Sequence, residues 1–344
     1  MDVSHNNNLT MNICTYNSKG HGMDRIEYIK YLMSRCDILF IQEHWMYDHD
    51  IHTLEQTIGN VNVFGVSAMD SSTLLIGRPH GGCAIVYNKS LNMVISQIDT
   101  GNPRICAAKI KITGSLSFLL FNVYMPCDRR NAHANNIQYN PNQYDSVLQD
   151  ISNICTKFSH IDHILIGGDF NTDVTRTQSI HTVSLNAYCL ADDLSCCTRD
   201  LNVTEFSYEN SVGNRSFLDH FLVSENMIRS VTKLQVIHSG DNLSDHCPVI
   251  MSCDIKGMAD SVKVGHISYQ PKPSWRLATQ EHIERYKSQL NVVLSALSIP
   301  DAIHCHNSKC SGHSAEIIQY HNDIVQACIS CMNDSIPCTK HINA

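Results

Sequence analysis

Apolar, strand-like stretches of this chain repeatedly end in acidic and amide side chains, and residues 163–173 show the pattern most clearly. Residues 163–166 lead into two glycines, which are followed by Asp169 and Asn171. The pattern predicts a buried strand that ends in a tight loop. Because a rigid strand holds in place the side chains that the next loop exposes, chemistry is often found there. A single stretch with this pattern is more often a plain strand end with an Asx turn. A functional site is therefore indicated only if similar polar residues occur at other strand ends.

Polar side chains of the same kinds stand at the ends of, or inside, other strand-like stretches: Asn17, Glu43, Asp219, and Asp245 with His246. A carboxylate beside one apolar strand is usually a salt-bridged structural residue. Several such groups without a shared purpose would be costly, whereas one cleft would let them satisfy each other. We therefore expect these residues to meet Asp169 and Asn171 in one cleft.

Carboxylates that gather in one cleft repel each other, and a bound cation relieves that repulsion. Glu43, Asp245 and Asn17 offer the oxygen ligands that Mg²⁺ prefers, and Mg²⁺ also bridges readily to phosphate oxygens. Zn²⁺ would more often use histidine and cysteine. We therefore expect Mg²⁺ as the cofactor, with Mn²⁺ as a substitute.

The same residues can be given roles in phosphodiester hydrolysis, which needs an activated water and a stabilised leaving oxygen. Asp169 would orient and deprotonate the water. His246, with its ring fixed by Asp219, would donate a hydrogen bond to the phosphate. Asn171 and Tyr124 would hold the phosphate.

A rival site with Ser244 as nucleophile lacks the strand-to-helix elbow that such a serine needs. Trp45 could stack on a base, but packing under the Glu43 loop is the favoured interpretation. Arg129 and Arg130 could meet DNA phosphates, although short clusters of charge more often form a solvated face.

The elements that must position these residues are strands and helices in alternation. Strands are expected over residues 11–16, 38–42, 61–66, 81–87, 92–97, 105–112, 116–125, 163–166, 204–208, 216–223 and 231–237. Helical spacing is found over 24–35 and 142–158. The segments 81–87 and 92–97 are interpreted as a hairpin, and 105–112 with 116–125 as the next pair. Strand, helix and strand around 142–158 form a βαβ pattern.

The composition changes after Asp254, where glycines and a Pro-Lys-Pro sequence indicate a linker. We therefore divide the chain into a polar arm, 1–8, a catalytic domain, 9–254, a linker, 255–273, and a helical C-terminal extension, 274–344. Helices are expected over 274–297 and about 315–332 in the extension. A zinc site formed there by Cys305, His306, Cys310 and His313 is the less favoured alternative, because zinc knuckles usually show tighter paired spacing.

Length and composition limit the possible classes of protein. A chain of 344 residues can hold one large α/β domain of about 250 residues and an appendage. With 43% hydrophobic and 17% charged residues, it belongs with folded globular proteins. A formal charge of −8 argues against a non-specific polyanion binder, but it is compatible with a small, metal-assisted nucleic-acid footprint.

The first residues are polar and have no secretory pattern, and no apolar run reaches the ~20 residues that span a bilayer. We therefore expect an intracellular protein, in the nucleus or cytoplasm, without membrane contact. The 16 cysteines are then expected to be reduced thiols. Cys14, Cys83, Cys106 and Cys247 are predicted core residues.

Six short motifs together resemble the endonuclease/exonuclease/phosphatase superfamily, in order and spacing, over about residues 9–254. They are Thr-Tyr-Asn-Ser-Lys-Gly, Ile-Gln-Glu, Asn-Val-Tyr-Met-Pro, Gly-Gly-Asp-Phe-Asn-Thr, Phe-Leu-Asp-His and Ser-Asp-His-Cys-Pro. The resemblance implies a four-layered α/β sandwich, with two mainly antiparallel sheets flanked by helices, and divalent-metal phosphoesterase chemistry. The positions that match the family's functional residues are Asn17, Glu43, Tyr124, Asp169, Asn171, Asp219, Asp245 and His246.

Within the superfamily, the chain resembles the endonucleases of non-LTR (LINE-type) retrotransposons. The residues that carry this resemblance are Gly-Asp-Phe-Asn-Thr, the spacing of Trp275, Ala278, Glu281 and Tyr286, and the later Ile299, Pro300, Cys305 and Cys310. In such proteins the endonuclease precedes a reverse transcriptase, whose motifs this chain lacks. The resemblance implies a DNA-nicking enzyme with DNA as substrate, and element RNA as a partner of a downstream region.

Lys19 stands where apurinic-site repair enzymes of the superfamily carry an acidic residue, which argues against the repair branch. Two alternatives stay open. One is a phosphoesterase acting on lipid or inositol phosphates, and the other is an inactive fragment or scaffold.

Overall fold

The computed structural model describes residues 10–75, 77–91, 93–112, 116–127, 142–255, 273, 275, 278–305 and 311–337. Contacts between residues divide the chain into two compact units, Met1–Ile267 and Ser268–Ala344. The predicted arm and nearly all of the predicted linker lie outside the described residues.

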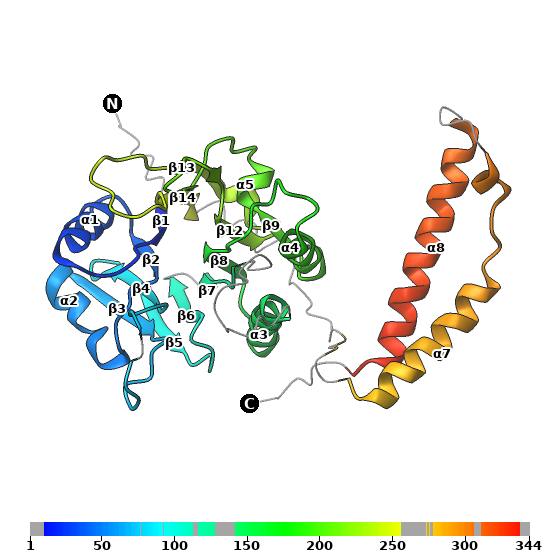
Figure 1. The fold of residues 1–344 in the computed structure, drawn as a ribbon, viewed down its shortest axis with the longest axis horizontal. Coiled ribbons are helices and arrows are strands. Elements are labelled where there is room, and N and C mark those ends of the chain that lie inside the picture. The colour runs from blue at the N-terminus through cyan, green and yellow to red at the C-terminus, as the bar shows by residue number, and fades with distance from the viewer. Residues whose placement is uncertain are drawn as a thin grey trace, which may run out of the picture. The chain divides into compact units, whose positions relative to one another are not determined.

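Two six-stranded mixed sheets form the centre of the first unit (Figure 1). The first sheet has the order β13 (Val231–Val236), β14 (Val249–Asp254), β1 (Thr10–Asn17), β2 (Ile38–Gln42), β4 (Cys83–Asn88), β3 (Val61–Val66). The second has the order β5 (Met93–Ile98), β6 (Ile105–Ile112), β7 (Ser117–Tyr124), β8 (His163–Asp169), β12 (Asp219–Ser224), β9 (Leu194–Cys196). A small ribbon joins β10 (Tyr208–Glu209) to β11 (Arg215–Ser216).

The sheets pack face to face because each presents one apolar face to the other. Their shared core includes Ile13 and Phe40 from the first sheet, and Phe118, Leu165 and Phe221 from the second. The helices α1 (Met23–Met33) and α2 (Thr53–Ile58) cover the first sheet, and α3 (Gln143–Lys157) and α4 (Ile180–Ala191) lie beside the second, while α5 is one short turn, Cys197–Asp200. The predicted four-layered α/β sandwich is confirmed.

Two parallel strand pairs set the position of the polar strand ends. β7 and β8 are parallel neighbours whose connection contains α3, as the βαβ pattern predicted. β1 and β2 are likewise parallel neighbours, and their connection contains α1. The carboxyl ends of parallel neighbours meet at one edge of a sheet. β12 runs antiparallel to β8 and begins with Asp219 directly opposite Asp169.

A buried amide network joins the two sheets below this edge. Gln42 on β2 donates from Nε2 to Asn122 Oδ1 on β7 at 2.6 Å. The Asn122 amide donates in turn to the backbone oxygens of Ile41 and Ala84, each at 2.8 Å. Because a buried amide is costly without partners, this network fixes the register of one sheet against the other.

The predicted hairpin of residues 81–87 and 92–97 is wrong. β4 pairs with β2 and β3 in the first sheet, whereas β5 pairs with β6 in the second. The short connection after Asn88 therefore crosses from sheet to sheet. Local sequence cannot distinguish the two cases, because a turn and a crossover of this length carry the same residue types. The neighbouring pair, β6 with β7, is confirmed.

Smaller differences concern the elements near the site. The strand expected over 204–208 is the two-residue β10, and the one expected over 216–223 is split into β11 and β12. Cys14, Cys83 and Cys106 are buried, as predicted, whereas Cys247 is only half-buried. Its side chain lies beside a pocket that the sequence did not indicate.

The second unit contains the helices α7 (Gln280–Ala296) and α8 (Ser311–Ser335), which pack together, with a short turn of helix at Asp301–His304. Thr279 caps α7, and Trp275 packs edge-on against Tyr286 with ring centroids 5.0 Å apart. None of the described helices is long and apolar enough to span a membrane.

Candidate active site

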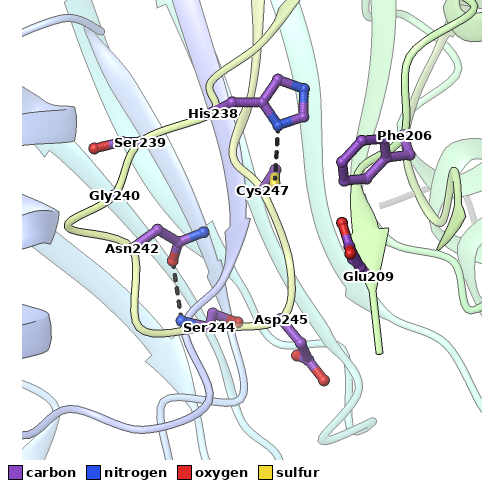
Figure 2. Close-up of a pocket in the computed structure, with 9 residues that line it drawn as sticks. All are labelled: Phe206, Glu209, His238, Ser239, Gly240, Asn242, Ser244, Asp245 and Cys247. Atoms are coloured by element: carbon purple, nitrogen blue, oxygen red, sulfur yellow. Dashed lines mark hydrogen bonds between the residues drawn. The ribbon is translucent and has the colours of Figure 1, made fainter. Parts of the chain in front are cut away.

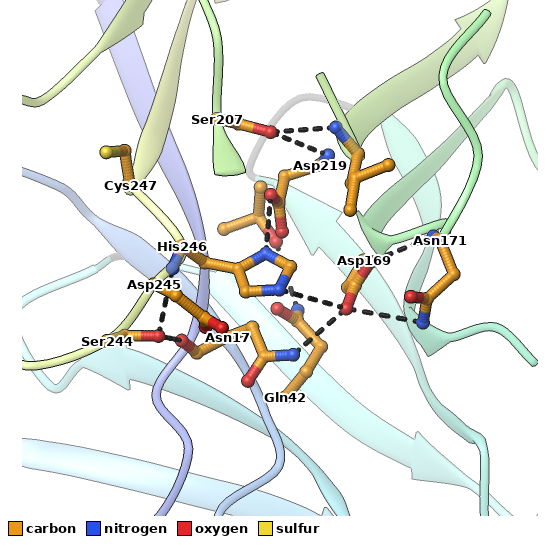
Figure 3. Close-up of polar contacts among 12 residues, drawn as sticks. Asn17, Gln42, Asp169, Asn171, Ser207, Asp219, Ser244, Asp245, His246 and Cys247 are labelled. Atoms are coloured by element: carbon orange, nitrogen blue, oxygen red, sulfur yellow. Dashed lines mark hydrogen bonds and ion pairs between the residues drawn. The ribbon is translucent and has the colours of Figure 1, made fainter. Parts of the chain in front are cut away.

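The structure brings the predicted residues together where β1, β2, β7 and β8 end and β12 begins (Figure 3). Asn17 makes the central link. Its Nδ2 donates to Asp169 Oδ2 at 2.9 Å and lies 3.0 Å from Glu43 Oε1. These contacts join the two sheets across 152 residues of sequence.

The loop after β8 holds the second oxygen of Asp169. The backbone N–H of Asn171 donates to Asp169 Oδ1 at 2.8 Å, and the Asn171 amide donates to the backbone oxygen of Met125 at 2.8 Å. This is the Asx turn that the sequence offered as the plain alternative. Here it also orients a buried carboxylate toward the shared site.

His246 lies between two buried carboxylates. Its Nδ1 is 2.9 Å from Asp219 Oδ2, and its Nε2 is 3.7 Å from Asp169 Oδ2. Ser207 Oγ accepts hydrogen bonds from the backbone N–H groups of Leu218 and Asp219, which fixes the start of β12. The arrangement is a carboxylate–histidine–carboxylate row.

Within this row, the pKa values of Asp169 and His246 are shifted so that the two groups have different protonation states at neutral pH. Burial raises the pKa of Asp169 to about 6, with His246 opposing the rise and Asp219 adding to it. Burial alone would lower the pKa of His246, but the charges of Asp219 and Asp169 outweigh it and raise the value to about 9. At neutral pH the imidazole therefore holds its proton and acts as a donor, while Asp169 can accept one.

Asp245 stands at the edge of the row and forms an ion pair with Lys19. The lysine contacts Asp245 Oδ2, while Oδ1 is buried without a hydrogen-bond partner among the described residues. Sequence reasoning noted Lys19 only as a departure from the repair enzymes, because nothing local links residues 226 positions apart.

Tyr124 is hydrogen-bonded to Glu43, which also accepts from Asn17. Burial, followed by the charges of Glu43 and Asp169, raises the pKa of the Tyr124 hydroxyl, which therefore stays protonated. Arg104 lies over the Tyr124 ring at 5.4 Å. Trp45 donates from Nε1 to Glu43 Oε2 at 3.1 Å.

Backbone strain gathers at these strand ends. Of the seven described non-glycine residues with left-handed φ angles, four lie here: Lys19 at 48°, Glu43 at 53°, Trp45 at 58° and Asn171 at 48°. Such angles persist only where the surrounding contacts fix them, and they are typical of functional sites.

Ser244, the rival nucleophile, has a structural role. Its hydroxyl donates to the backbone oxygen of Asn17 at 2.7 Å. Next to it, Asn242 accepts from the Tyr16 hydroxyl and donates to the backbone oxygen of His246, both at 2.7 Å. Sequence reasoning missed Asn242, Ser207 and Tyr16, and the contact of Tyr16 with Asn242 joins residues 226 positions apart. Arg129 and Arg130 lie outside the described residues.

The donor set fits a divalent cation. Asp169, Asp219 and His246 have potential ligand atoms within 4.8 Å of one another, and because His246 holds its proton at neutral pH, the two carboxylates are the ligands that this group offers. Asp219 Oδ1 and Asp245 Oδ1 are buried carboxylate oxygens without a hydrogen-bond partner among the described residues. Unpaired, buried acceptors of this kind are what a hard cation binds. The assignment of Glu43, Asp245 and Asn17 as the ligands stays a prediction.

Fold and site together define a phosphoester hydrolase of a known class. The model of the Endonuclease/Exonuclease/phosphatase family matches residues 9–246, and the chain belongs to this family. None of the curated proteins compared with the chain matches its sequence significantly.

Several solved structures share the fold. The endonuclease domain of TRAS1, a telomere-specific non-LTR retrotransposon, is 16% identical with a TM-score of 0.54, over 72% of this chain and 99% of that one. The AP endonuclease LMAP from Leishmania major is 14% identical with a TM-score of 0.57, over 71% and 88%. The 3' phosphatase NExo from Neisseria, bound to a product DNA hairpin, is 18% identical with a TM-score of 0.53, over 71% and 99%.

Proposed function

We propose that the chain is a Mg²⁺-dependent endonuclease that nicks DNA, of the type encoded by non-LTR retrotransposons. The observation that carries the proposal is the row in which the His246 ring lies 2.9 Å from Asp219 and 3.7 Å from Asp169. The likeness to the TRAS1 endonuclease domain and the motifs after residue 274 support the retrotransposon branch.

In this proposal Asp169 orients the attacking water and accepts its proton. Asn17 and Asn171 keep the carboxylate in position through their hydrogen bonds. Since burial raises the pKa of Asp169 to about 6, its carboxylate is a stronger base than an exposed one and is still ionised at neutral pH.

His246 donates a hydrogen bond to a phosphate oxygen, and its positive charge stabilises the charge that develops there. Asp219 fixes the ring and holds its proton. Tyr124 and Asn171 are proposed to hold the phosphate from the other side, since the protonated hydroxyl and the amide are both donors.

Glu43, Asp245 and Asn17 are the proposed Mg²⁺ ligands, and a bound ion would neutralise phosphate oxygens and stabilise the leaving oxygen. Lys19 already supplies one positive charge at Asp245. A lysine where repair enzymes carry an acid is the reason to prefer a nicking enzyme over an apurinic-site repair enzyme.

Relaxation of supercoiled plasmid in Mg²⁺ tests the proposal directly. We expect the wild type to produce nicked circles, and Asp169→Ala and His246→Ala to lose at least about 10³-fold in rate. Asp70→Ala and His160→Ala, which change the same residue types outside the site, are the matched controls. Chelation by EDTA should abolish nicking.

Parallel substrates separate this function from the alternatives. Faster cleavage of an abasic-site duplex, or removal of a 3′ phosphate without plasmid nicking, would favour another branch of the family. Hydrolysis of sphingomyelin or inositol phosphates without nicking would favour a lipid or inositol phosphoesterase. Equal activity of wild type and both variants would defeat the assignment of the site.

A further inference from the structure

Lys19 is the only lysine or arginine among the described residues that forms an ion pair with a predicted site residue. It lies in the turn after β1, and its partner Asp245 lies in the loop before β14. The side chains are 34% and 27% exposed. The pair is thus half-buried, and its charges are less screened than those of a pair in free solvent.

Backbone contacts hold Lys19 beside the loop that carries its partner. Its φ angle is 48°, and its backbone N–H donates to Asn17 Oδ1 at 3.2 Å. Arg25 donates to the backbone oxygens of Ser18 and Leu243, at 2.8 and 3.1 Å, and so ties the turn to the loop. The ion pair therefore forms at a junction that other contacts already fix.

The two oxygens of Asp245 have different surroundings. Asp245 lies next to His246 and also lines a pocket of about 480 Å³ with Phe206 and Glu209 (Figure 2). Its Oδ2 contacts Lys19, whereas Oδ1 is buried and has no hydrogen-bond partner among the described residues. A divalent ion that binds Asp245 therefore meets one unpaired oxygen, while an ammonium group occupies the other.

Lys19 balances part of the negative charge of the site. Four carboxylates come together here, those of Glu43, Asp169, Asp219 and Asp245. The protonated ring of His246 and the ammonium of Lys19 balance two of these charges. One divalent ion would balance the other two. Without the lysine, three charges would remain, and the attraction for a cation would be stronger.

We propose that Lys19 is a resident counter-ion of the active site that weakens the binding of divalent ions there. The inference rests on the proposed function, in which Asp245 is a metal ligand. A divalent ion at Asp245 must share this carboxylate with the ammonium or displace it, and the two positive charges repel each other. Lys19 thus stabilises the metal-free site, and the enzyme needs more free Mg²⁺ than its carboxylates alone would require.

Binding of Mn²⁺ to the full-length protein tests the proposal without any nuclease reaction. Free Mn²⁺ has a sharp EPR spectrum that broadens on binding, so the titration gives an affinity directly. We expect Lys19→Met, which keeps the length of the side chain and removes its charge, to bind Mn²⁺ at least about 10-fold more tightly than the wild type. Lys19→Arg should stay within about 3-fold of the wild type, and Lys19→Asp should bind more tightly than Lys19→Met.

A lysine outside the site provides the matched control. Lys30 pairs with Glu27 on α1, and Lys30→Met should bind Mn²⁺ like the wild type. Asp245→Asn should bind at least about 10-fold more weakly, which identifies the site that is measured. In EDTA, Lys19→Met should melt at a lower temperature than the wild type. Mn²⁺ should then raise its melting temperature by more, because the ion replaces the lost partner of Asp245.

The outcomes separate this proposal from the proposed function. Unchanged Mn²⁺ affinity in Lys19→Met, or an equal gain in Lys30→Met, would overturn the role of Lys19 even if the wild type nicks DNA. Unchanged affinity in Asp245→Asn would overturn it too, because the ion would bind elsewhere. A wild type that does not nick DNA would defeat the proposed function, whereas the expected order of Mn²⁺ affinities would still support Lys19 as the counter-ion.

Discussion

The protonation of His246 decides which residue can act as base. Its ring lies between Asp219 at 2.9 Å and Asp169 at 3.7 Å, and their charges hold a proton on it at neutral pH. A protonated imidazole donates and cannot accept. In the proposed reaction the role of base therefore falls to Asp169, whose pKa of about 6 suits a reaction near neutral pH.

The Asp219→Asn variant is expected to lose about 10³- to 10⁴-fold in kcat for plasmid nicking. The amide would favour the wrong tautomer of His246 and remove a charge that keeps the ring protonated. Nicking rates at saturating DNA measure the effect, with Glu27→Gln on the exposed face of α1 as the control. A KM effect without a kcat effect would contradict the orienting role of Asp219.

The same histidine predicts how stability depends on pH. The pKa of His246 is raised from 6.5 to about 9, so its contribution to the free energy of unfolding is complete below pH 6.5. This contribution, about 3 kcal/mol, is lost as the pH rises through 9.

Urea unfolding in EDTA, from pH 6 to 10, measures this dependence. The His246→Asn variant should be less stable at pH 6 and should lack the decline between 6.5 and 9. A wild-type profile that is flat across this window would show that the two carboxylates do not hold the proton.

At the scale of elements, two glycines precede the last residue of β8, because other parts of the fold approach the backbone closely there. A Cβ on Gly168 would lie 2.0 Å from the backbone oxygen of Val123 on β7. A Cβ on Gly167 would lie 2.6 Å from the Phe221 ring and 2.7 Å from the Phe40 ring. The glycines thus let the strand that carries Asp169 sit against both its neighbour and the other sheet.

Replacing Gly168 by alanine should therefore destabilise the fold by at least about 3 kcal/mol, or prevent soluble expression. The backbone oxygen of Val123 cannot move without breaking the β7–β8 pairing. Gly22→Ala is the control, since its Cβ would meet no atom within 4 Å, and it should change stability by less than about 0.5 kcal/mol. Equal urea midpoints for both variants would refute the close approach.

At the scale of the whole molecule, each sheet supplies part of the site. Asn17 and Glu43 come from the first sheet, and Tyr124, Asp169 and Asp219 from the second. Because the sheets share one core, the site exists only when both have formed. Unfolding of the first unit should be cooperative for the same reason.

Truncation tests which part of the chain the site needs. A chain that ends at residue 267 should keep the fold and the nicking activity, because it retains β14. A chain that ends at residue 248 should not fold, since β14 lies between β1 and β13 in the first sheet. Circular dichroism and plasmid nicking measure both. Loss of fold in the longer truncation would show that the second unit is required.

The sequence by itself determined the family, the α/β class and the residue types of the site. Strand periodicity and the βαβ pattern are local properties, and the Asp169 stretch carries both. The prediction that distant polar strand ends converge also holds for Asn17, Glu43, Asp169, Asp219 and His246. The reason is that buried charges without partners would cost too much.

Only the tertiary structure decided which groups touch. The ion pair of Lys19 with Asp245, the amide link of Gln42 with Asn122, and the facing of Cys247 with His238 each depend on the positions of separate segments. The assignment of β4 and β5 to different sheets does so too. A residue pattern reports which face of a strand is buried, but the partner across that face is selected by the packing of the complete fold.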